Sequence, residues 1–156
     1  MYFWKIEKLK QDLIENGLSQ SALFKYIFIY VFLSALSYEL TYNFVSEEST
    51  NIDYIQSALN MALVGFATYF CYVANGGNNG ADFAERFFSI GFVVSIRFIV
   101  LLVPIMIAMG FLFWDSEDID DVSTKWYDVA VLSGWTALLY WRVVYHINQV
   151  AKQAHA

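Results

Sequence analysis

The stretch that decides the fold is residues 87–114, FFSIGFVVSIRFIVLLVPIMIAMGFLFW, in which Arg97 is the only charged residue. As an α-helix it would be about 42 Å long, which exceeds the roughly 30 Å of a bilayer's hydrocarbon core. Apolar stretches of the same kind cover residues 22–45, 54–74 and 125–150. With the stretch that spans 83–114, they predict four transmembrane helices.

The composition of the 156-residue chain excludes an ordinary soluble domain. Hydrophobic residues make up 58% and charged residues 15%, against roughly 45–50% and about 25% in soluble proteins. Cys71 is the only cysteine, so no disulfide can form within the chain. The net charge of −6 is sorted by segment, and its placement therefore matters more than its sum.

The first 17 residues predict a separate amphipathic helix. Phe3, Ile6, Leu9 and Leu13 recur at helical spacing, and charged residues cover the rest of the surface. Such a helix can lie flat at the cytoplasmic membrane surface or pack on a partner or a second copy. The predicted fold class is an all-α integral membrane protein: a four-transmembrane-helix bundle with an N-terminal amphipathic interfacial helix.

The distribution of positive charge predicts the topology. Seven Lys and Arg residues lie in segments 1–25, 75–86 and 142–156, whereas the acidic loops 46–53 and 115–124 with their flanks hold Lys125 alone. Positive charge favours the cytoplasmic side, so both termini and the 75–82 loop are expected there, in an inner or cytoplasmic membrane. Because the loops are short, we expect consecutive helices to be antiparallel neighbours.

Four residues predict a basic site near the cytoplasmic side: Arg86, Arg97, Arg142 and His146. Ionisable side chains inside a span are costly and often functional. The guanidinium fork suits an anion such as a lipid phosphate, a small phosphorylated ligand or a partner's carboxylates, or it can line a pore. The alternative for Arg86 and Arg142 is that their side chains reach back to the headgroups. For Arg97, which is deeper, we expect an inward-facing role.

A second polar group lies nearer the outer side and consists of Glu39, Asn60 and Asp128. A carboxylate in this setting can bind a cation or carry a proton. The alternative is a hydrogen-bonded contact between helices.

The loop between the second and third spans is rich in Gly and Asn, which tolerate positive φ and indicate a tight turn. Its residues are Asn75, Gly76, Gly77, Asn78, Asn79, Gly80 and Asp82. We expect Asp82 and Glu85 to form a capping box for the third span, and Pro104 to kink that span. A hairpin connection is the main interpretation of the loop, and docking of a cytoplasmic protein is the alternative.

No motif of a known catalytic centre occurs, so a non-enzymatic role is expected, with no catalytic residue, cofactor, metal or nucleic acid. The first hypothesis is a homo-oligomeric channel or membrane-perturbing pore that uses the basic residues. The alternative is a non-conducting membrane anchor, immunity or defence subunit that docks a cytoplasmic partner. A third hypothesis is a small proton- or cation-coupled carrier built around Glu39.

Overall fold

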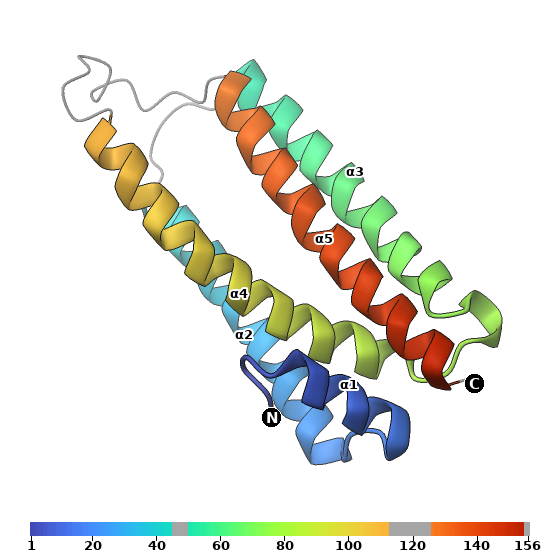
Figure 1. The fold of residues 1–156 in the computed structure, drawn as a ribbon. Coiled ribbons are helices and arrows are strands. Elements are labelled where there is room, and N and C mark those ends of the chain that lie inside the picture. The colour runs from blue at the N-terminus through green and yellow to red at the C-terminus, as the bar shows by residue number, and fades with distance from the viewer. Residues whose placement is uncertain (45–49, 113–125, 155–156) are drawn as a thin grey trace.

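The computed structural model describes residues 1–44, 50–112 and 126–154, and the described residues form five α-helices and one short 3₁₀-helix (Figure 1). The helices are α1 (Ile6–Glu15), α2 (Gln20–Phe44), α3 (Asn51–Ala74), α4 (Phe83–Leu112) and α5 (Trp126–Ala154), and η1 (Gly77–Asn79) lies between α3 and α4. Half of the 46–53 loop (46–49), all of the 115–124 loop, Trp114 and the last two residues lie outside the described residues.

Three helices are long and apolar enough to cross a membrane, and they indicate a membrane protein. The qualifying segments are Gln20–Ser37 of α2, the whole of α3, and Phe83–Ile105 of α4. Helix α5 does not belong to this group of described segments, because Arg142 and His146 reduce its apolar character. Helix α4 runs through Pro104 as one helix, and a kink there stays a prediction.

The four long helices form two parallel pairs instead of a series of adjacent hairpins. Helix α2 packs on α4, α3 packs along α5, and α4 joins the two pairs by packing on α5. Figure 1 shows α2 and α4 running one way and α3 and α5 the other. The expectation that consecutive helices are neighbours is therefore wrong for α2 with α3 and for α3 with α4, which form no packed interface in the described residues. Six residues connect α2 to α3, and an extended segment of that length spans roughly 20 Å, so the connection does not force contact.

Helix α1 lies across the end of the assembly that also carries η1 and the last turns of α5 (Figure 1). We call this the α1 end, and the opposite one the far end. The buried face of α1 is made by Ile6, Leu9, Lys10 and Leu13, and the helix packs on α4 and α5. The predicted apolar stripe is thus turned into the protein. Phe3 and Trp4, which precede the helix, remain more than half exposed.

The hydrophobic core is concentrated at the α1 end. Its members come from all five helices. They are Ile6, Leu9, Leu13, Tyr26, Cys71, Ile90, Phe92, Val93, Val94, Val143, Ile147 and Val150. The side chains of residues 31–37 of α2 and 57–62 of α3 are exposed, so the far end of each pair is open to its surroundings.

Candidate functional site

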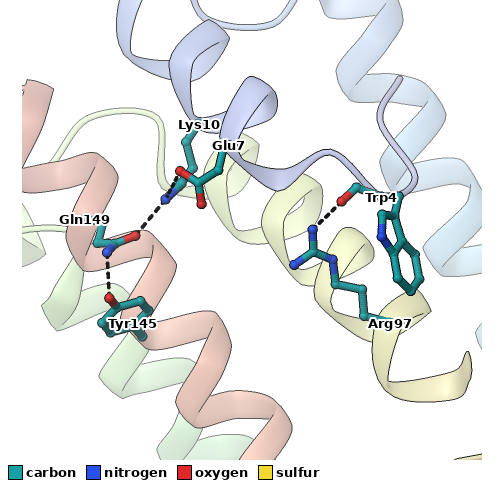
Figure 2. Close-up of polar contacts among 6 residues, drawn as sticks. All are labelled: Trp4, Glu7, Lys10, Arg97, Tyr145 and Gln149. Atoms are coloured by element: carbon teal, nitrogen blue, oxygen red, sulfur yellow. Dashed lines mark hydrogen bonds and ion pairs between the residues drawn. The ribbon is translucent and has the colours of Figure 1, made fainter. Parts of the chain in front are cut away.

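Arg97 of α4 is held by the chain that precedes α1. One terminal nitrogen of the guanidinium donates a hydrogen bond to the backbone carbonyl of Trp4 (Figure 2). The central guanidinium carbon lies 5.4 Å from the centre of the Trp4 ring, within the range of a cation–π contact. The Nε atom of Arg97 is buried and has no hydrogen-bond partner in the described residues. The cation is therefore only partly satisfied by its neighbours.

The residues before Trp4 are anchored to α2 and α4. The Tyr2 backbone N–H donates to the Tyr26 hydroxyl at 2.6 Å, and this hydroxyl points back to the Tyr2 carbonyl at 3.3 Å. The Phe3 and Tyr26 rings both make edge-on contacts with Phe92. The Tyr2 hydroxyl donates to Asp12 at 2.5 Å, and this hydrogen bond raises the pKa of Tyr2. The N-terminal residues are thus packed against the span that carries Arg97.

Lys10 ties α1 to α5 from the buried side of α1. Its Nζ atom donates to the Gln149 side-chain oxygen at 2.7 Å and lies 2.7 Å from a carboxylate oxygen of Glu7. Gln149 in turn donates to the Tyr145 hydroxyl at 2.8 Å, and Figure 2 shows these contacts as one chain from α1 to α5. A lysine on an inward face is tolerated because both charge and hydrogen-bonding capacity are met.

Arg86 has a different setting, next to the turn between α3 and α4. The side chain is 4% exposed, and one terminal nitrogen donates to the Asn75 side-chain oxygen at 3.0 Å. Asn75 is fully buried and caps the C-terminal end of α3. The partial negative charge of a helix C-terminus favours a nearby cation. Arg86 therefore fastens the start of α4 to the end of α3, which is a structural role.

The Gly/Asn loop is a folded turn whose shape requires glycine. Gly76 and Gly77 have φ of +105° and +58°, a region that residues with a Cβ atom adopt only with strain. A Cβ atom on Gly80 would lie 2.2 Å from the Asn75 carbonyl oxygen. The Asn75 side chain donates to the Ala81 carbonyl at 3.0 Å, so it closes the turn from inside. Asn78 and Asn79 are exposed.

The acidic residues that follow the turn do not have the predicted arrangement. Asp82 has a positive φ of +53°, whereas an N-cap residue normally has extended backbone. A carboxylate oxygen of Glu85 accepts a hydrogen bond from the Leu18 backbone N–H in the connection between α1 and α2. Glu85 thus joins α4 to that connection, and the expected capping box is wrong. The structure has a capping box at α3 instead, between Thr50 and Asp53.

Arg142 and His146 lie one turn apart on α5. Arg142 is exposed, and its guanidinium lies over the Tyr145 ring at 5.6 Å. His146 is 6% exposed, and its Nδ1 atom has no partner in the described residues. Arg86 and Arg97 therefore have separate neighbours, Asn75 and Trp4, whereas Arg142 and His146 both contact the Tyr145 ring. Whether the four predicted basic residues act together on one anion stays a prediction.

The second predicted polar group lies on three different helices of the far half. Glu39 on α2 and Asn60 on α3 have exposed side chains, and Asp128 is half-buried in the first turn of α5. Helices α3 and α5 pack together, which places Asn60 and Asp128 on neighbouring helices. Among the residues that the structure describes, no three His, Cys, Asp or Glu side chains are grouped to hold a metal ion.

Sequence reasoning missed two contributors to the Arg97 site, Trp4 and Tyr26. Trp4 precedes the predicted amphipathic helix, and the hydrogen bond of its backbone carbonyl has no sequence signal. The available signal was the aromatic run Tyr2–Trp4 in front of an amphipathic helix, which indicates that this segment has an apolar neighbour. Comparison of the chain with family models, with curated proteins and with solved structures finds no match, so the functional argument rests on this geometry.

Proposed function

We propose that the chain crosses the membrane four times, with the α1 end in the cytoplasm. Helix α5 packs along α3, which is itself a candidate span, and therefore lies at the same depth. Exposed aromatic residues occur at the start of α5, at Trp126 and Tyr127, and again about four turns further along, at Trp141 and Tyr145, as expected at the two membrane interfaces. The excess of Lys and Arg in the segments of the α1 end supports the orientation.

The N-terminal segment fits the cytoplasmic membrane interface in this orientation. Its helix presents Lys5, Lys8 and Glu15 outward, and Phe3 and Trp4 are 56% and 53% exposed. Aromatic rings of this kind partition into the headgroup layer. Part of the apolar face therefore packs on the bundle, and the part before α1 remains in contact with lipid.

The polar side chain of Asn60 supports a homo-oligomer. Asn60 lies near the middle of α3 and is exposed in the single chain. Hydrocarbon offers an amide no hydrogen bond, whereas a neighbouring protein surface or water does. Assembly of several copies around Asn60 provides the required polar surroundings.

We propose that this assembly is a non-enzymatic channel that conducts anions. The observation that carries the proposal is the position of Arg97, which lies five residues, or about 8 Å, further along α4 than Phe92. Phe92 is level with Tyr26, at the start of the apolar part of the first span. Arg97 is thus a cation within the membrane whose described partners are a carbonyl and an aromatic ring. A ring of such cations from several copies would favour anions.

Chloride efflux from vesicles that contain the purified protein tests the proposal. Replacing Arg97 with Gln removes the charge, and we expect efflux to fall at least about tenfold because the stabilising charge is lost. Arg97→Lys retains the charge and is expected to keep part of the efflux. Lys152→Gln is the matched control, since Lys152 is an exposed cation in the last turn of α5. Unchanged efflux in Arg97→Gln contradicts the proposal.

A second candidate function, docking of a cytoplasmic protein, is favoured by the way the α1 end is built. Glu85 joins the start of α4 to the α1–α2 connection, and Lys10 joins α1 to α5. The outer face of α1, the exposed Asn78 and Asn79, and the end of α5 therefore form one connected surface. A photo-reactive residue at position 79 would form an adduct with a second protein if this surface docks one. A residue at position 31, on the exposed face of α2, is the control, and equal labelling at both positions contradicts docking.

A further inference from the structure

The N-terminal residues Met1–Glu15 bind to three of the four long helices without belonging to any of them. We call this segment the strap. It contacts α2 through Tyr26, α4 through Arg97 and Phe92, and α5 through Gln149. Figure 2 shows the last turns of α5 on one side of the strap and Arg97 of α4 on the other. The strap therefore bridges the two helix pairs at the α1 end.

The connection between the strap and α2 has the properties of a hinge. Gly17 has a φ of +66° and lies next to the Glu85 carboxylate, and the following N–H, of Leu18, donates to Glu85. The chain is thus fixed at Leu18, and the residues before Gly17 are held by side chains of α1 and the chain before it. A movement about Gly17 can displace the strap while α2 and α4 keep their places.

The apolar face of the strap has two environments in which it can be buried. In the structure, Ile6, Leu9 and Leu13 are covered by the bundle. An amphipathic helix can bury the same face in the headgroup and acyl boundary of the membrane, and Phe3 and Trp4 already lie exposed. The apolar surface of the strap is therefore not transferred to water on release, which lowers the cost of its displacement.

Arg97 has hydrogen-bonding capacity that its partners in the structure leave unused. In the structure its guanidinium donates one hydrogen bond, to the Trp4 backbone carbonyl, and contacts the face of the Trp4 ring. Its Nε atom is buried without a hydrogen-bond partner among the described residues. An anion would offer charge-assisted hydrogen bonds to the same fork. Trp4 thus occupies the place where an anion would bind.

From these observations we infer that the strap closes the Arg97 site against anions, and that its displacement about Gly17 opens that site. The inference rests on the proposed channel and names how that channel is regulated. It assigns Trp4 the role of a plug, Gly17 that of a hinge, and the Lys10–Gln149 contact that of the fastening between strap and α5.

A cleavable cross-link tests the inference. The test variant replaces Lys10 and Gln149 with Cys and combines these changes with Cys71→Ser. It therefore carries two thiols in place of the 2.7 Å hydrogen bond between Lys10 and Gln149, which is the fastening. Without a tether this variant lacks the fastening, and we expect chloride efflux from vesicles to exceed that of the wild type. A short thiol-specific bridging reagent should lower efflux at least about tenfold, and a reductant should restore it.

The matched control carries both cysteines on α5, at Tyr145 and Gln149, in the same Cys71→Ser background. It removes the same Gln149 contact and consumes the same reagent, but it leaves the strap free, so its efflux should not respond to the tether. Trp4→Ala is a second variant that should raise efflux, with Trp126→Ala, an exposed Trp at the other end of the assembly, as its control.

The possible results separate the two proposals. Equal efflux with and without a tether whose formation is shown by mass spectrometry overturns the strap as a gate and leaves the channel in place. Absence of chloride efflux from every variant and from the wild type overturns the channel itself, and the gate with it. Efflux that falls on tethering and returns on reduction supports both.

Discussion

At the α1 end Leu9, Ile90 and Ile147 have no exposed surface, whereas Val31 and Met61 near the middle of their helices and Tyr54 at the far end are 62%, 77% and 66% exposed. The same four long helices run through both regions, and both regions are rich in large apolar residues. The difference lies in the strap, which adds a further layer at the α1 end and fills the space between the two helix pairs.

The comparison indicates which contacts stabilise the single chain and which surfaces remain available for assembly. In a membrane, lipid solvates an exposed apolar side chain as well as another helix does, so the exposed far half carries no penalty for its apolar residues. Its exposed polar side chains, such as Asn60, do carry one. We therefore expect substitutions at the α1 end to change the stability of the single chain, and those at the far end to affect its assembly.

The largest effect is expected from Gly80→Ala at the α1 end. The added methyl group would lie 2.2 Å from a backbone oxygen, which no side-chain movement can relieve, so the α3–α4 turn cannot form as it stands. We expect a loss of more than about 3 kcal/mol in the free energy of unfolding, measured by titration with SDS in mixed micelles. Gly134→Ala is the control, because nothing lies within 4 Å of a Cβ atom there. Equal stability of the two variants would contradict the described turn.

Leu9→Ala should be the next most damaging change. The Leu9 side chain is fully buried between the strap and the long helices, and a cavity at such a position costs about 3 kcal/mol. Val31→Ala, on the exposed part of α2, should change the free energy of unfolding by less than about 0.5 kcal/mol. Similar losses at both positions would show that the far half is also packed within one chain.

Asn75→Ala tests how much the Asn75 side chain contributes to the stability of the α3–α4 turn. The substitution leaves buried Arg86 without its acceptor and Ala81 without its donor, at an expected cost of about 2 kcal/mol. Asn79→Ala, an exposed change in the same loop, should be close to neutral by the same titration. The opposite order of the two effects would indicate that Arg86 has another partner.

Thr50→Ala is expected to have the smallest effect. It removes the capping box at the start of α3, where Thr50 and Asp53 exchange hydrogen bonds, and such caps contribute about 1 kcal/mol. Hydrogen exchange of the first amides of α3 should become faster, whereas Thr50→Ser should preserve their protection. Unaltered exchange in Thr50→Ala would mean that another group caps the helix.

The existence and extent of the long helices follow from the sequence, because long apolar runs between polar loops allow little else. At α3 the helix extends beyond the predicted span: the span is predicted to begin at residue 54, and the helix begins at Asn51. The pattern Thr50-x-x-Asp53 is a readable capping signal that explains the three extra residues.

The pairing of the helices and the partners of the site residues could not be predicted in this way. Four similar apolar helices can pack in several orders, and apolar periodicity does not choose between them. Arg97 contacts a residue 93 positions away, and Lys10 turned out to lie on the buried face of α1 because Gln149 and Glu7 satisfy it. Arg86 and Asn75 were each identified as notable, but only the three-dimensional turn joins them.

The measurement that tests the central claim most directly is the reversal potential of single-channel currents in planar bilayers under a potassium chloride gradient. The wild type should show anion selectivity, and Arg97→Glu should shift the reversal potential toward the value for cations, because the charge at this position in the membrane is inverted. A conducting Arg97→Glu variant with the reversal potential of the wild type would contradict the account, since it would place Arg97 outside the conduction path.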